Sequence, residues 1–196
     1  MTTAAALLAE IAAEFPGFRV VHKRHSPLSR GIDLALRALT LGRQRAYLTQ
    51  YHTVIGCTLY LPDAWEGASE IDRVIVLRHE RVHLRQFRRY GRLGMAALYL
   101  VPLLPIGLAW GRARLEWEAY RETLAATAEL RGLATARSPA LRQQIVGRFV
   151  SGAYGWMWPF RRVVERWYDD VIRELEARTD LSSRRPPPRD RHPEEA

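Results

Sequence analysis

The chain has 196 residues, about the length of one domain, and 47% of them are hydrophobic, which is enough to build a substantial core. Its single cysteine, Cys57, excludes an intramolecular disulfide, and we expect this thiol to be buried and unreactive within a strand. The formal net charge of +9 favours anionic partners, but no nucleic-acid-binding motif accompanies it, so we expect a membrane surface rather than a specific nucleic acid.

The N-terminal part of the chain predicts two helices with a short strand between them. Residues 1–15 are apolar at helical spacing, but they carry Glu10 and Glu14 and have no basic start. They therefore predict an amphipathic helix instead of a secretion signal, and a cytoplasmic location is expected. Residues 18–21 predict a strand, and residues 29–41 have the apolar spacing of a second helix.

The composition then changes to one typical of β-structure. Residues 45–61 are dense in Tyr, Thr, Val and Ile and run into Pro62, which predicts two strands with a hairpin near His52. The fold class expected from this pattern is α+β, mostly helical, with a small sheet next to the helix that follows.

The most specific motif is His79-Glu80-Arg81-Val82-His83, which lies in a predicted helix over residues 71–87. At about 3.6 residues per turn, His79 and His83 project from one helix face, one turn apart, so a single Zn²⁺ can bind both imidazoles. Glu80, about 100° around the axis, can reach a water molecule on that ion and take its proton. The motif predicts a zinc-dependent hydrolase. The alternative is a solvated, charged helix whose two His residues bind nothing.

Residues 93–110 (LGMAALYLVPLLPIGLAW) carry no charge and are flanked by Arg on both sides. As one helix they would measure about 27 Å, close to the hydrocarbon thickness of a bilayer of about 30 Å. Pro102 and Pro105 divide the segment, which favours two short arms. We expect a hairpin that either contacts a membrane or is buried in the protein, and that folds the next helix back onto the His79 motif.

The third zinc ligand is expected from a helix over residues 111–131, closed by Gly132. Glu116 is the preferred ligand because the residues three or four positions along from it are small or apolar, and such a face can pack against the His79 helix. Glu118 lies about 200° away on a charged face, so both cannot reach one metal ion. Glu118 remains the alternative.

With these residues the sequence resembles the gluzincin metallopeptidases, especially the membrane-associated ones in which H-E-x-x-H is followed, after an apolar insertion, by a helix carrying E-x-x-x-D. The resemblance covers about residues 46–131. It implies a zincin-like fold with His79, His83 and Glu116 as zinc ligands and Glu80 as the catalytic base.

Two positions depart from the gluzincin pattern. Tyr120 stands where these families place an Asp that orients a ligating His, so its phenol is a candidate for that role or for a catalytic one. Arg81 places a charge between Glu80 and His83, where many zinc peptidases have none. In the family, a strand beside the cleft binds the extended substrate, and residues 56–61 are either that strand or an ordinary core strand.

The C-terminal part predicts two helices within residues 139–177, joined by an aromatic segment over residues 154–162 that either packs inside the protein or contacts a membrane surface. Residues 179–196 are rich in Pro and charge and predict a disordered tail. A single metallohydrolase domain is therefore expected over residues 1–178.

The sequence leads to a principal hypothesis and two alternatives. The principal one is a zinc peptidase acting on a peptide or protein substrate, with an oxyanion donor supplied by Tyr120, His52 or Tyr154. The second is a non-catalytic, membrane-attached binding or scaffolding module of the same fold, which the departures at Arg81 and Tyr120 favour. The third is nucleic-acid binding driven by charge alone.

Overall fold

The computed structural model describes residues 2–39, 41–42, 45–100, 109–151, 157–158 and 160–183. The elements in these ranges follow one another along the chain as α1 (Ala4–Glu14), β1 (Arg19–His22), η1 (Lys23–His25), α2 (Pro27–Leu39), β2 (Thr53–Ile55), β3 (Thr58–Leu61), η2 (Asp63–Trp65), α3 (Glu70–Leu100), α4 (Trp110–Arg131), α5 (Leu133–Ala136), α6 (Pro139–Val150) and α7 (Arg161–Ser183). The predicted α+β class, mostly helical with a small sheet, is confirmed.

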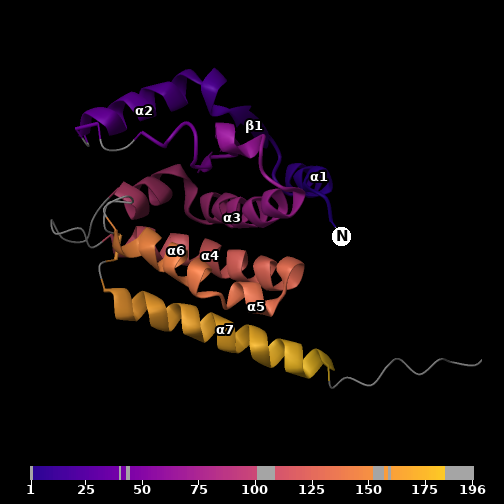
Figure 1. Ribbon diagram of the computed structural model, residues 1–196. Helices are drawn as coiled ribbons and strands as arrows, with labels where there is room; N and C mark the ends of the chain where they lie inside the picture. The colour runs from indigo at the N-terminus through magenta and orange to yellow at the C-terminus, as the bar shows by residue number, and fades with distance from the viewer. Residues whose placement is uncertain are drawn as a thin grey trace, which may run out of the picture.

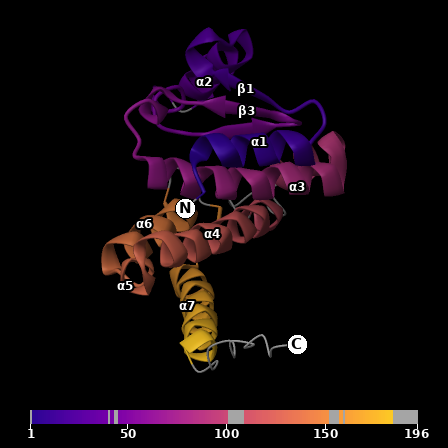
Figure 2. The ribbon, with the colours of Figure 1, turned by 90° about the vertical axis from the view of Figure 1, so that its right-hand side faces the viewer.

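The elements are stacked in layers, which two perpendicular views show clearly (Figures 1 and 2). Helix α2 lies over the sheet, the sheet lies over α1 and α3, and α4 lies on the other side of α3. Helices α5, α6 and α7 follow beyond α4. Helix α3 is therefore in the middle of the molecule, between the sheet and the C-terminal helices.

Two hydrophobic clusters stabilise these layers. The first joins α1, the sheet and the N-terminal half of α3, and its fully buried side chains include Ile11, Leu59 and Leu77. The second joins α4, α6 and α7 through Leu124 and Phe149, among others. Helix α1 is also fixed at its start, because Thr3 caps it and the amide of Ala4 donates to Glu70 of α3 at 2.6 Å. The contact between α3 and α4 lies between the two clusters.

The sheet has the order β1-β3-β2, with β3 parallel to β1 and antiparallel to β2. Of the two alternatives for residues 56–61, the ordinary core strand is correct, because β3 is paired on both sides and β1 and β2 are the edge strands. The hairpin turns at Gly56 and Cys57 instead of near His52. Gly56 has φ 61°, which favours glycine. Cys57 is exposed in this turn, so the expectation of a buried thiol is also wrong.

Helix α3 is bent at Gly91, whose φ of 67° and ψ of 177° are accessible essentially to glycine alone. The bend turns residues 92–100 away from the direction of the first part of the helix. Of the apolar segment over residues 93–110, the structure describes the helical residues 93–100 and the start of α4, and residues 101–108 lie outside the described part. Within the described residues, no helix has the length and apolar character needed to span a membrane.

The C-terminal helices follow the predicted order with one difference in length. Helix α4 ends at Arg131, followed by Gly132 with φ 88°, as predicted. Helix α7 continues to Ser183, so residues 179–183 are helical where a disordered tail was expected. Residues 184–196 and Tyr154 lie outside the described residues.

Candidate metal centre

Helix α4 turns its small and apolar face toward α3, as the pattern around Glu116 predicts. Ala119 and Thr127 are buried in this contact, and so is Glu116 itself. Glu118 lies at the margin, where it accepts a hydrogen bond from Gln86 of α3 at 3.0 Å. The structure thus directs Glu116, and not Glu118, toward the His79 motif.

His79, His83 and Glu116 meet at the centre of the α3–α4 contact. The Nε2 atoms of His79 and His83 are 3.2 Å apart, and Oε2 of Glu116 lies 4.0 Å from the first and 3.9 Å from the second. Among the described residues, this group of three could hold a metal ion, since its ligand atoms all lie within 4.8 Å of one another.

The tautomer of His79 follows from its hydrogen bonds. The hydroxyl of Thr123 donates to the carbonyl of Ala119 at 3.2 Å, so it accepts from Nδ1–H of His79, 2.9 Å away. With its proton on Nδ1, His79 presents a lone pair on Nε2. Burial and the neighbouring His83 keep the pKa of His79 well below its ordinary value, which holds the imidazole neutral.

His83 is held in the same way by Gln86. The side-chain amide of Gln86 donates to the carbonyl of Leu115 at 2.9 Å and to Glu118, which leaves its Oε1 to accept from Nδ1–H of His83 at 2.9 Å. Both imidazoles therefore direct Nε2 lone pairs at each other across 3.2 Å. Two facing lone pairs repel each other, whereas a metal ion between them can be bound by both.

Tyr99 holds the carboxylate of Glu116. Its hydroxyl, carried on the part of α3 beyond Gly91, donates to Oε1 of Glu116. This leaves Oε2 as the atom that faces the two imidazoles. Burial and the adjacent Glu116 raise the pKa of Tyr99 well above its usual range, so the phenol keeps its proton and remains a donor.

Glu80 is buried beside the group of three. Burial raises the pKa of Glu80 to about 7, opposed by the nearby His83 and supported by Glu116. Lys23, the only lysine, interacts electrostatically with Glu80, and its ammonium group donates to the carbonyl of Tyr47 at 3.0 Å and to the hydroxyl of Thr53 at 2.8 Å. Burial lowers the pKa of Lys23 to about 7, against an attraction to Glu80.

Two predicted candidates for orienting a ligand or donating to an oxyanion lie close to His79. The ring of Tyr120 stands edge-on to His79, with 5.0 Å between centroids, and burial raises the pKa of its phenol.

His52, the second candidate, precedes the edge strand β2 and packs against Trp65. Burial lowers the pKa of His52 to about 4, so the ring is neutral, and its Nε2 is buried with no hydrogen-bond partner among the described residues.

Arg81 points away from the ligands. Its guanidinium lies 2.6 Å from Glu14 and 3.3 Å from Glu10, both on α1. This face of α3 also lines a cavity of about 700 Å³ between α1, α3 and α4, in which Arg78 is paired with glutamates of α4. The charge at Arg81 therefore belongs to the α1 contact, and it does not disturb the candidate metal centre.

The sequence did not single out three of the residues that orient the ligands. Gln86 follows His83 by three positions and so shares its helix face, which is a signal that could have been used. Thr123 lies on the same face of α4 as Glu116, but its bond to His79 depends on how α3 and α4 pack together. Nothing in the local sequence marks Tyr99, because its approach to Glu116 depends on the bend at Gly91.

Comparison of the chain with protein-family models, with curated proteins and with solved structures gave no match. The geometry of the α3–α4 contact is therefore the basis of the functional interpretation.

Proposed function

We propose that the protein is a zinc-dependent metallohydrolase, and most specifically a peptidase, with a zincin-like arrangement of its sheet and α3. The observation that carries the proposal is the pair of Nε2 lone pairs of His79 and His83, fixed face to face by Thr123 and Gln86. A neutral structural His pair without a ligand would gain by moving the proton of one ring to the facing Nε2, and the outer hydrogen bonds oppose that tautomer.

The donor set is the reason for choosing zinc. Two imidazoles and one carboxylate form a common catalytic zinc set. Two nitrogens bound at about 2.0–2.1 Å in a tetrahedral site lie about 3.3 Å apart, close to the 3.2 Å between the Nε2 atoms. When bound, the ion would supply Lewis-acid polarisation of a carbonyl and a lowered pKa for water.

The roles of the protein's own groups follow from their positions. Glu80 accepts the proton of the attacking water, because it is the buried carboxylate beside His83 and Glu116. Tyr99 holds Glu116 with one oxygen toward the imidazoles. His52 and Tyr120, both beside His79, are the candidates for donors to a developing oxyanion.

The edge strand β2 supports a peptide as the substrate. It lies beside α3 and, within the described part of the chain, is paired only with β3, so one side of its backbone is open to pairing with an extended chain. Residues of β2 also reach the centre indirectly, because Thr53 accepts from Lys23, which in turn attracts Glu80.

Metal analysis combined with a hydrolysis assay tests the proposal. We expect one equivalent of zinc in the purified protein, and cleavage of casein or a peptide library that Glu80→Gln abolishes without loss of the metal. Glu129→Gln, which alters an exposed glutamate of α4 paired with Arg78, is the matched control and should stay active.

The same experiment separates the alternatives. Glu116→Gln should lose zinc, whereas Glu118→Gln should retain it. Zinc at one equivalent without turnover on any substrate would favour the non-catalytic module. Protein that binds no zinc at neutral pH would refute the metal centre itself.

A further inference from the structure

The part of α3 beyond Gly91 exposes an apolar surface where a surface helix usually carries charge. Leu93 is 87% exposed, and Ala96 and Ala97, which share its helix face, are exposed too. The opposite face of the same segment is used internally, since Met95 is buried and Tyr99 reaches Glu116. The outward face, Leu93, Ala96 and Ala97, is called the Leu93 stripe, and it is not covered by any of the described residues. The inner face, in contrast, packs inside the protein.

A cluster of aromatic rings lies at the same end of the molecule. Trp158 lies 4.8 Å from Trp110 and 5.2 Å from Phe160 between ring centroids, and it stacks on Trp167. Phe160 is 50% exposed and Trp110 is 37% exposed. This cluster is thus only partly covered by protein, and its open side consists of ring surface.

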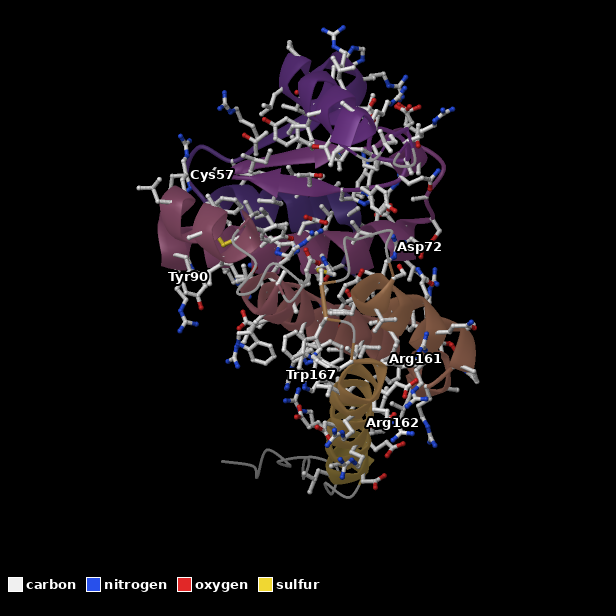
Figure 3. The ribbon with its side chains drawn as sticks, turned by 90° about the vertical axis from the view of Figure 1, so that its left-hand side faces the viewer. Cys57, Asp72, Tyr90, Arg161, Arg162 and Trp167 are labelled. Atoms are coloured by element: carbon white, nitrogen blue, oxygen red, sulfur yellow. The ribbon has the colours of Figure 1, made fainter. Side chains whose placement is uncertain are left out.

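The end of α3 and the aromatic cluster are joined through the start of α4. Gly111, next to Trp110, packs so closely on Leu98 that a Cβ there would lie 2.8 Å from the Leu98 carbonyl oxygen. The amide of Ala109 donates to Met157 at 3.1 Å, which ties the start of α4 to the aromatic cluster. Figure 3, which faces this end, shows Tyr90 on one side and Arg161 and Arg162 on the other, with Trp167 between them.

The charge around this surface is mostly positive, although Glu165 is paired with Arg161 and Glu14 lies near Arg88. The sequence has no acidic residue between Glu80 and Glu116, or between Glu129 and Glu165. Both stretches contribute to this end of the molecule, and they supply Arg89, Arg92 and Arg162. No ion pair joins these three to a carboxylate within the described residues.

We propose that this end of the molecule, formed by the Leu93 stripe, Trp110, Phe160 and the surrounding arginines, binds the surface of an anionic phospholipid bilayer. Exposed aliphatic and aromatic side chains enter the headgroup region, and Trp favours that region in particular. The arginines are attracted to anionic headgroups, and each arginine near the surface increases the affinity for the membrane about fivefold. Such contact is parallel to the bilayer and needs no spanning helix. The proposal does not depend on the metal centre.

Vesicle flotation tests this proposal with the full-length protein. We expect wild type to float with vesicles of phosphatidylcholine and phosphatidylserine, and to bind at least tenfold more weakly to phosphatidylcholine alone. The double variant Leu93→Ser/Phe160→Ser should lose about tenfold or more of the binding. Leu181→Ser is the matched control, because Leu181 is 70% exposed at the opposite end of α7 and should bind as wild type does.

A second set of variants tests the charge. Arg89→Gln/Arg92→Gln should weaken binding to anionic vesicles by roughly 25-fold, whereas Arg178→Gln, far along α7, should change it less than twofold. Equal binding to neutral and anionic vesicles would overturn the proposal. So would a failure of wild type to float, or a loss in Leu181→Ser as large as in the double variant.

Discussion

The substitution Thr123→Val tests whether the hydroxyl on α4 fixes the tautomer of His79. Valine has nearly the shape of threonine, but it offers no acceptor to Nδ1–H of His79. His79 can then carry its proton on Nε2 and donate it to Nε2 of His83, 3.2 Å away. That internal hydrogen bond would engage both ligand nitrogens, and a metal ion would have to break it.

The expected effect on metal binding is larger than the effect on folding. Loss of an outer partner of a ligating His weakens metal affinity by about 10- to 100-fold, or about 1.4–2.7 kcal/mol. The free energy of unfolding of the metal-free protein should fall by about 1 kcal/mol or less, because the displaced N–H finds a new acceptor in His83.

Competition with a chromogenic chelator at pH 7 measures the zinc affinity, and urea unfolding measures the stability. Thr127→Val is the control, since the hydroxyl of Thr127 donates to the carbonyl of Thr123 at 2.7 Å, one turn further along α4. Zinc affinity within twofold of wild type in Thr123→Val would refute the reasoning. An equal loss in Thr127→Val would show that the effect comes from α4 as a whole.

Two further predictions concern stability. The pKa of Glu14 is lowered to about 2, chiefly by its hydrogen bond from Arg85, so its ionised form stabilises the protein above pH 4.5 and this contribution is lost as the pH falls from about 4.5 through about 2. In Glu14→Gln, urea unfolding should show that the free energy of unfolding falls by about 1 kcal/mol at pH 7 and by less at pH 3. The figure is kept small because the half-exposed Arg85 is screened by solvent. An equal decrease at both pH values would contradict the assignment. Gly91→Ala should cost about 1–3 kcal/mol, because alanine is strained at φ 67° and ψ 177°; an unchanged urea midpoint would show that the bend at Gly91 is not needed.

Helical periodicity was sufficient to place most elements of the fold. The spacing around Glu116 predicted which face of α4 meets α3, and Gly132 marked where α4 ends. The sheet was less predictable because its pairing is long-range. Residues 45–61 contained the two strands, but only the parallel pairing of β1 with β3 makes β3 the central strand.

The candidate metal centre was likewise predictable only in part. His79, His83 and Glu116 were recognised because helix spacing constrains them, and the structure brings them together. Tyr99 was missed because a single glycine conformation, at Gly91, carries it to Glu116. Long-range hydrogen bonds of this kind depend on how helices cross, which the local sequence does not encode.

The position of the centre has a thermodynamic consequence for the whole molecule. An ion held by α3 on one side and α4 on the other would tie the sheet-facing half to the C-terminal helices. An ion that binds only the folded form adds about 2.7 kcal/mol at a free concentration 100 times its Kd. We therefore expect the loaded protein to melt in a single cooperative transition, whereas removal of the ion should allow the two halves to melt at separate temperatures in calorimetry.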